Sequence, residues 1–230
     1  MRARYNWPVR RARSLVFAAA VAALAGGGAA GCGRDEPARN LDLELIRVSA
    51  DARMRTDTVG GDAFQDTATF VLVDAENRAA EGAYVTLGGA LLSEAGAEVS
   101  VLRAQSLWIP AGAARTFALV DSERKARPEA KTARIEVRGA LVPRDPPRAH
   151  IDELHSFVDD GRVVVQAYLV NDADRLGRIV VIGAFHDEAN QPMTRPFEIV
   201  EIAARSRQVV RFVGPPRSKR GTIFVGDVVY

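Results

Sequence analysis

Residues 159–170 read Asp-Asp-Gly-Arg-Val-Val-Val-Gln-Ala-Tyr-Leu-Val, a short polar segment followed by a dense apolar run. The polar segment favours a tight turn, because aspartate bonds to its own backbone and glycine tolerates left-handed angles. The β-branched residues after it favour a strand in the interior of a sheet. This stretch therefore predicts β structure whose strands are joined by tight turns.

The same succession of apolar runs and turn signals recurs through the chain. Many short strands with a turn about every ten residues are typical of antiparallel sandwiches rather than of a parallel sheet. The fold class that we expect is therefore all-β. The predicted strands are 41–45, 67–73, 83–87, 163–170, 178–185, 208–213 and 222–229, and the predicted turns are 74–77, 95–96, 159–161 and 171–174. Only residues 122–131 allow a helix, which Pro128 limits to a turn or two.

Two polar stretches divide the chain into units. Residues 32–40 lack an apolar pattern, which predicts a flexible tether. Residues 142–148 contain three prolines, which remove backbone donors and favour an extended linker. We therefore expect two Ig-like antiparallel β-sandwich domains in tandem, the first at 41–141 and the second at 149–230.

The two expected domains are similar to each other in sequence. Gly-Ala-Leu-Leu-Ser-Glu-Ala-Gly at 89–96 matches Gly-Ala-Phe-His-Asp-Glu-Ala-Asn at 183–190 position for position. Because the identity is low, two interpretations stay open, an internal repeat and a chance likeness between two Ig-like sandwiches. The other matched segments are 73–76 with 170–173, 109–113 with 202–206 and 133–137 with 221–225.

The N-terminal segment has the order of an export signal. Five arginines precede an apolar run at Leu15–Leu24, and small residues then lead to Cys32. That run is about half the roughly 20 residues that a helix needs to cross a bilayer, which favours a cleaved signal at 1–31 over a membrane span. Ala29-Ala30-Gly31-Cys32 resembles the end of a type II signal peptide of bacterial lipoproteins. Ala29 stands where that family prefers leucine, and an ordinary signal peptide cut nearby is the alternative.

The lipoprotein resemblance implies a lipid on Cys32, which is the only cysteine of the chain. A lone cysteine forms no internal disulfide, so no cross-link of that kind holds the folded part together. Gly33 stands where retention at the inner membrane would call for aspartate. The resemblance therefore implies an outer-membrane protein that is anchored by its N-terminal lipid and faces the periplasm or the cell surface.

The charge of the chain depends on whether its signal segment is counted. The chain holds 31 basic and 29 acidic side chains, and residues 1–31 hold five of the arginines and no acid. Without that segment the chain is mildly acidic. A nucleic-acid-binding protein keeps a basic surplus on its folded part, so we exclude nucleic acid as a partner.

Side chains that could carry out chemistry are sparse. The three histidines are His150, His155 and His186. Metal ligation needs two or more of them on one face, whereas His150 and His155 are an odd number apart and point to opposite faces of a strand. We interpret all three as surface residues. The sequence also lacks a Gly-x-Ser-x-Gly nucleophile motif, and the polar residues at 171–174 lack the spacing of a calcium loop. We expect no enzyme, no cofactor and no metal.

A second resemblance concerns the strand and turn at 184–190, Ala-Phe-His-Asp-Glu-Ala-Asn. It is similar to the strand and turn of FxLYD-type domains, small Ig-like modules common in bacterial surface lipoproteins. The likeness covers residues 162–229 and, more faintly, 67–138. His186 stands where that family favours tyrosine, and Asn190 where it favours glycine. The resemblance implies a role in binding or spacing, although a fold by itself fixes no function.

The candidate interaction residues lie in two basic loops and at one tryptophan. Each expected domain carries a basic loop before its final strand, and such loops could meet an anionic envelope polymer or an envelope protein. A merely solvated loop is the alternative. Trp108 ends a strand, where it could cap a sandwich core or anchor a partner. The loop residues are Arg124 and Lys125 in the first domain and Arg217, Lys219 and Arg220 in the second.

Two classes of function follow from these observations. The first is a lipid-anchored, non-catalytic protein of the cell envelope, whose tandem modules bind or space envelope components. The alternative is an envelope solute- or metal-binding protein with a ligand pocket between its two domains, where ligands often bind.

Overall fold

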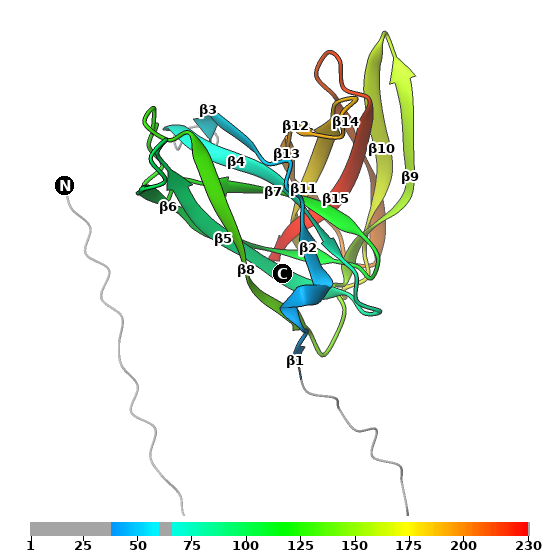
Figure 1. Ribbon diagram of the computed structural model, residues 1–230. Coiled ribbons are helices and arrows are strands. Elements are labelled where there is room, and N and C mark those ends of the chain that lie inside the picture. Colours follow the sequence, from blue (N-terminus) through cyan, green and yellow to red (C-terminus); the bar gives the residue numbers. More distant parts are fainter. Residues whose placement is uncertain (1–37, 60–65, 230) are drawn as a thin grey trace, which may run out of the picture. The chain divides into compact units, whose positions relative to one another are not determined.

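The structure of the chain is a computed structural model (Figure 1), which describes residues 38–59 and 66–229. The expected signal segment, Cys32 and most of the expected tether lie outside the described residues. The fold is all-β, as predicted, and its strands form two antiparallel sandwiches in tandem. Among the described residues no helix is long and apolar enough to span a bilayer.

The first sandwich consists of two sheets. One sheet has the strand order β1-β8-β5-β6, and the other has the order β2-β4-β3 with β7 also paired to β4. Arg39 and Asn40 of the expected tether form β1, which pairs with the end of β8. The bounds are β1 Arg39–Asn40, β2 Ile46–Val48, β3 Arg53–Val59, β4 Asp66–Asn77, β5 Ala83–Leu92, β6 Glu98–Ile109, β7 Ala114–Val120 and β8 Thr132–Val142.

The second sandwich repeats this plan. One sheet has the order β14-β10-β9, and the other has the order β12-β11-β13 with β15 also paired to β11. The bounds are β9 Ala149–Asp159, β10 Arg162–Asn171, β11 Gly177–His186, β12 Pro192–Thr194, β13 Phe197–Ile202, β14 Ser206–Val213 and β15 Arg220–Val229. The dense apolar strands at 67–73, 83–87, 163–170, 178–185, 208–213 and 222–229 are thus confirmed.

Matching hydrogen bonds identify the two sandwiches as structural repeats. The side-chain oxygen of Asn77 accepts a bond from Ala79 N, and its amide donates to Ile109 O; Asn171 accepts from Ala173 N and donates to Ile202 O. Gly96 and Asn190 hold equivalent left-handed turn positions, with φ of 76° and 69°. The match of 89–96 with 183–190 is therefore correct. The match of 73–76 with 170–173 is displaced by three residues, because Asn77 is the equivalent of Asn171.

Two predicted local structures are wrong and one helix that the sequence allowed does not form, because in each case a side chain or a partner strand overrides the local pattern. In place of a strand at 41–45, Leu43–Leu45 form a 3-10 turn, because the Asp42 carboxylate accepts a bond from Glu44 N. In place of a turn, residues 74–77 continue β4, where they pair with β2 and β7. No helix forms at 122–131, since the buried Asp121 carboxylate binds the amides of Glu123 and Lys125.

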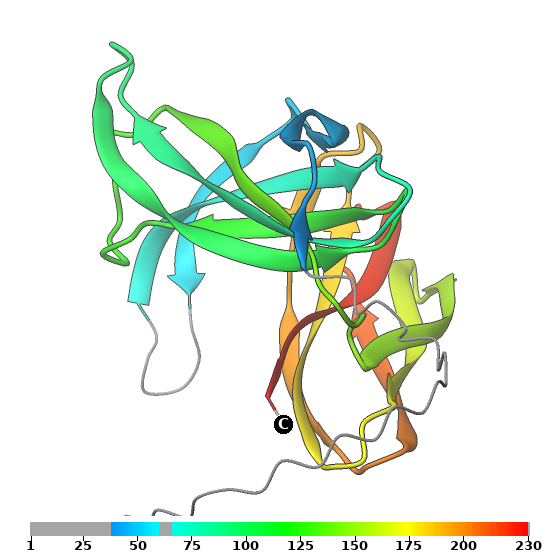
Figure 2. The ribbon, with the colours of Figure 1, turned by 90° about the horizontal axis from the view of Figure 1, so that it is seen from below.

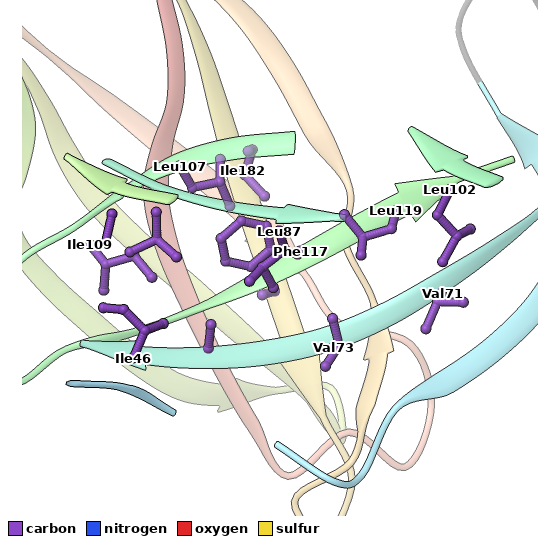
Figure 3. Packing of buried hydrophobic residues seen from close by; sticks show 14 of the residues in the cluster. Ile46, Val71, Val73, Leu87, Leu102, Leu107, Ile109, Phe117, Leu119 and Ile182 are labelled. Atoms are coloured by element: carbon purple, nitrogen blue, oxygen red, sulfur yellow. The ribbon is translucent and has the colours of Figure 1, made fainter. Parts of the chain in front are cut away.

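β11 belongs to two hydrophobic cores. Because successive side chains of a strand point to opposite faces, Ile179 and Val181 enter the core of the second sandwich. Ile182 and Ala184 enter the core of the first sandwich, and Figure 3 shows Ile182 among its residues. Figure 2 shows the end of β11 and the start of β15 meeting the strands of the first sandwich. The apolar run at 178–185 is therefore buried on both of its faces.

Candidate functional site

A pocket of about 580 Å³ lies where the two sandwiches meet. We call it the interface pocket. Its first wall comes from β2, β4 and β7 of the first sandwich, and its second wall comes from the end of β11 and the start of β15. The polar and charged residues that line it are Arg47, Ser49, Asp51, Asp74, Glu76, Arg115 and Thr116 on the first wall and His186, Asn190, Arg220 and Thr222 on the second.

The alternation that buries β11 also places His186 in this pocket. His186 shares the even-numbered face of β11 with Ile182 and Ala184, which pack into the first sandwich. It is 7% exposed, so its interpretation as a surface histidine is wrong. On the neighbouring strand β15, Arg220 is its direct partner in register. The second wall of the pocket thus presents an imidazole beside a guanidinium.

Asp74 connects the two walls. Its Oδ2 lies 2.8 Å from His186 Nε2, and its Oδ1 accepts a hydrogen bond of 2.5 Å from the hydroxyl of Thr116. Since a carboxylate only accepts hydrogen bonds, the Nε2–H of His186 is the donor. Thr116 is 2% exposed and lies directly opposite Asp74 on β7. These three side chains form a hydrogen-bonded floor for the pocket.

Opposing effects set the pKa of Asp74. Burial alone would raise it, but the hydrogen bonds from His186 and Thr116 and the positive charges of His186 and Arg220 together hold the pKa below its ordinary value. Asp74 is therefore ionised at neutral pH. Its carboxylate accepts hydrogen bonds from His186 and Thr116, and it also attracts the guanidinium of Arg220.

Two largely buried arginines share one aromatic ring. The guanidinium carbon of Arg115 lies 5.2 Å from the centre of the Phe224 ring, and that of Arg195 lies 5.8 Å from it. Arg115 Nη1 donates to Ala114 O, and Arg195 Nε donates to Thr116 O at 2.7 Å. Burial lowers the pKa of each to about 10, which leaves both protonated at neutral pH.

Each of these arginines also keeps an unsatisfied buried nitrogen. Within residues 38–59 and 66–229, Arg115 Nε and Arg195 Nη2 have no hydrogen-bond partner, and neither arginine forms an ion pair. A cation over an aromatic face gains about 0.5–2 kcal/mol, which offsets only part of the cost of burying a guanidinium. Of the two, Arg115 lines the interface pocket.

The charged residues of the pocket are unequally paired. Glu76 forms an ion pair of 3.2 Å with Arg78, and Asp74 is engaged by His186. Among the described residues two acids of the lining, Asp51 and the ionised Asp74, form no ion pair with an arginine or a lysine, whereas three arginines, Arg47, Arg115 and Arg220, lack an ion-pair partner. The unpaired charge of the pocket is therefore positive.

Further contacts fasten the sandwiches beside the pocket. Arg53 of β3 bonds to Asp187 at 3.1 Å and to Gln191 at 3.2 Å. Arg55 Nη1 donates to the carbonyl of Met193 at 2.6 Å. The sequence of β3, Arg-Met-Arg-Thr-Asp-Thr-Val, is too polar to have been predicted as a strand. This strand is held by contacts with the second sandwich, since Arg53 lies 134 and 138 positions before its partners Asp187 and Gln191.

The structure separates the predicted interaction residues. Arg220 lines the interface pocket, whereas Lys219 and Arg217 do not. Arg124 and Lys125 form exposed ion pairs with Asp66 at 3.9 Å and Glu123 at 2.9 Å. Arg124 and Arg217 each have a left-handed φ, of 55° and 70°.

Trp108 is half-buried on the outer side of its sheet. Its ring lies 5.4 Å from that of Tyr84, its cross-strand neighbour, and covers Gly82. It also lines a smaller pocket of about 270 Å³ together with Phe224 and His150. This placement, against neighbouring side chains of its own sheet, agrees with a capping role more closely than with a free anchor.

The prediction that His150 and His155 point to opposite faces of their strand is wrong. A β-bulge at 152–155 inserts an extra residue into β9, where Glu153 has a φ of 49°. His150 therefore lies opposite Val170 and His155 opposite Gln166, on one face of the sheet. Even so, the described residues contain no group of three histidine, cysteine or acidic side chains that could hold a metal ion. The turn after Asn171 instead rests on the bond from Ala173 N to its side chain, as predicted for 171–174.

Neither a protein family nor a curated protein matches this chain.

Proposed function

We propose that this chain is a non-catalytic binding protein of the bacterial cell envelope, which holds a small solute between its two sandwiches. The observation that carries the proposal is the interface pocket of about 580 Å³, which both sandwiches line. Binding sites for small molecules are commonly clefts of about 300–1,000 Å³ at the junction of two domains. This pocket has that size and that position.

The hydrogen bonds of the floor support binding rather than catalysis. The Thr116 hydroxyl donates to Asp74 instead of to the imidazole, and His186 Nε2 is occupied by the same carboxylate. A hydroxyl nucleophile needs a base within hydrogen-bond reach that is free to take its proton. Here the three groups satisfy one another, so they fix the walls of the pocket in place.

The pocket can be tested by filling it. Ala114 is an exposed residue of the lining, so Ala114→Trp places an indole in the pocket without entering a core. The matched control is Ala104→Trp at an exposed position of β6 outside the lining. We expect at least one of glucose, choline, citrate and inorganic phosphate to raise the melting temperature of the wild type and of Ala104→Trp, but not that of Ala114→Trp. Four flat titrations of the wild type would contradict the proposal.

The membrane attachment in this proposal comes from the sequence. If Cys32 carries lipid, the six residues between it and β1 could span about 20 Å when extended, which keeps the sandwiches close to the bilayer. Labelling with radioactive palmitate in a bacterial host tests this part. Wild type should incorporate label and Cys32→Ser should not. Equal labelling of both would remove the anchor and leave a secreted pair of sandwiches.

A further inference from the structure

We infer that the interface pocket takes a small organic or inorganic anion, whose carboxylate or phosphate oxygens bind Arg115, Arg220 and Arg47. This inference rests on the proposed function and adds the chemical class of the solute. It assigns the positive charge of the pocket to ligand binding.

The first support is the charge that the protein leaves uncompensated. Three arginines of the lining, Arg47, Arg115 and Arg220, lack ion pairs within the described residues, against two acids, Asp51 and Asp74, that pair with no arginine or lysine. A neutral or cationic solute would leave this surplus in place. An anion would neutralise it, and guanidinium groups are well suited to the task because they bind carboxylate and phosphate through two parallel hydrogen bonds.

The second support is the burial of Arg115. A guanidinium taken out of water is costly unless it is paired and fully hydrogen-bonded. Arg115 has one bond to a carbonyl, an aromatic ring beside it and a buried Nε without a partner. A structural role would be served as well by an uncharged side chain of similar length. An anion in the adjoining pocket supplies the missing counter-charge in surroundings of low dielectric, where the attraction is stronger than at the surface.

The third support is the distribution of the cations over the two walls. Arg220 belongs to β15 of the second sandwich and faces the pocket beside His186. Arg115 and Arg47 belong to β7 and β2 of the first sandwich. One anion that contacts both walls would connect the sandwiches, and the hydroxyls of Ser49 and Thr222 add neutral donors to the same lining. Ligand binding should therefore stabilise the fold as a whole.

The test uses the full chain and isothermal titration calorimetry at low salt with two anionic probes, citrate and inorganic phosphate. We expect at least one of them to bind, and the affinity to fall at least about tenfold in Arg115→Gln and in Arg220→Gln, since each removes a charge-assisted contact. Arg103→Gln removes the same charge from an exposed position of β6 and should bind as the wild type does. The difference between citrate and phosphate tells which oxyanion the pocket prefers.

The melting temperature of the ligand-free variants separates a binding role of Arg115 from a structural one. Loss of a buried, unpaired charge should leave the melting temperature of Arg115→Gln unchanged or raise it, even though the response to anions is lost. A lower melting temperature with unchanged anion affinity would overturn the inference. So would binding of glucose or choline in the pocket with no response to either anion, a result that would leave the proposed function intact. Binding of no probe at all would overturn both.

Discussion

β5 and β11 occupy the same place in the two repeats, yet their outer faces meet different surroundings. In β5, Tyr84 and Thr86 remain partly exposed, and the side chain of Arg138 lies across Gly88. In β11, Ile182 stands at the position equivalent to Gly88 and packs into the core of the first sandwich. The outer face of this strand is thus partly open to solvent in the first sandwich and buried in the second.

The difference shows that the contact between the sandwiches depends on a few even-numbered residues of β11. Each repeat needs only one apolar face per sheet to form its own core. Ile182 and Ala184 go beyond that need, and His186 ends the same row with its bond to Asp74. The position equivalent to His186 in β5 is Leu92, which is only partly buried. The interface pocket forms where the second sandwich packs against the first.

The largest expected effect comes from truncating Ile182 of β11. Ile182→Ala should lower the free energy of unfolding by about 3 kcal/mol, because it removes buried methylene groups and leaves a cavity between the sandwiches. On β5, where Gly88 takes the equivalent position, the nearby change Thr86→Ala on the same outer face should cost about 1 kcal/mol or less, since Thr86 is partly exposed. Urea unfolding measures both. Equal costs would contradict the asymmetry between the two strands.

The repeat itself predicts two effects of similar size. Asn77 and Asn171 are both fully buried, and each bonds to a backbone amide and to at least two carbonyls. Replacing either one by alanine leaves these groups unpaired and should cost about 2 kcal/mol. Urea unfolding of Asn77→Ala and Asn171→Ala is the measurement. A neutral result for one of them would show that the two amides are not equivalent in energy.

The Asp74–His186 bond predicts a dependence of stability on pH. Because the folded pKa of Asp74 lies below its unfolded value of 3.8, its contribution is complete above that value and is lost as the pH falls below it. Asp74→Asn should therefore lower the free energy of unfolding by about 1.5 kcal/mol at pH 7. At pH 3 the difference from the wild type should be smaller. A difference that grows toward low pH would contradict the assigned direction.

The smallest effect is expected on β10, whose outer face is equivalent to that of β4. There Tyr168 takes the place of Asp74 and lies under the guanidinium of Arg207, 4.4 Å from the ring centre. Because no second sandwich covers this face, Tyr168→Ala should cost about 1 kcal/mol. A double-mutant cycle with Arg207→Ala should give a coupling below about 1 kcal/mol. A coupling above about 2 kcal/mol would indicate a buried contact.

The sequence predicts the parts of this fold that depend on residues close to one another along the chain. The Val163–Val170 run and the turn at Asp159–Gly161 suffice for the β10 hairpin, because β-branched residues and left-handed turn positions act on their own neighbours. The match of 89–96 with 183–190 reveals the repeat for the same reason. The bulge at Glu153 could not be predicted, because the extra residue in β9 is apparent only from the register in which β9 pairs with β10.

The candidate site could not be predicted, because its residues meet only when the sandwiches pack together. Asp74 and His186 are 112 positions apart, and Asp74 stands in a stretch, Asp-Ala-Glu-Asn, that is typical of a turn. The one available signal is that His186 continues the even-numbered apolar row of β11. A histidine at the end of a strand that is apolar on both faces is a candidate for burial, and Arg220 could then be sought on the neighbouring strand.

The two sandwiches, with the inferred anion site at their junction, should act as one unit. Differential scanning calorimetry of the full chain without ligand, with citrate and with inorganic phosphate tests both parts of this expectation. We predict a single unfolding transition, because β11 contributes side chains to the cores of both sandwiches, and an upward shift of that whole transition with at least one of the two anions. Two separate transitions would contradict this expectation. So would a single transition whose temperature changes with neither citrate nor phosphate.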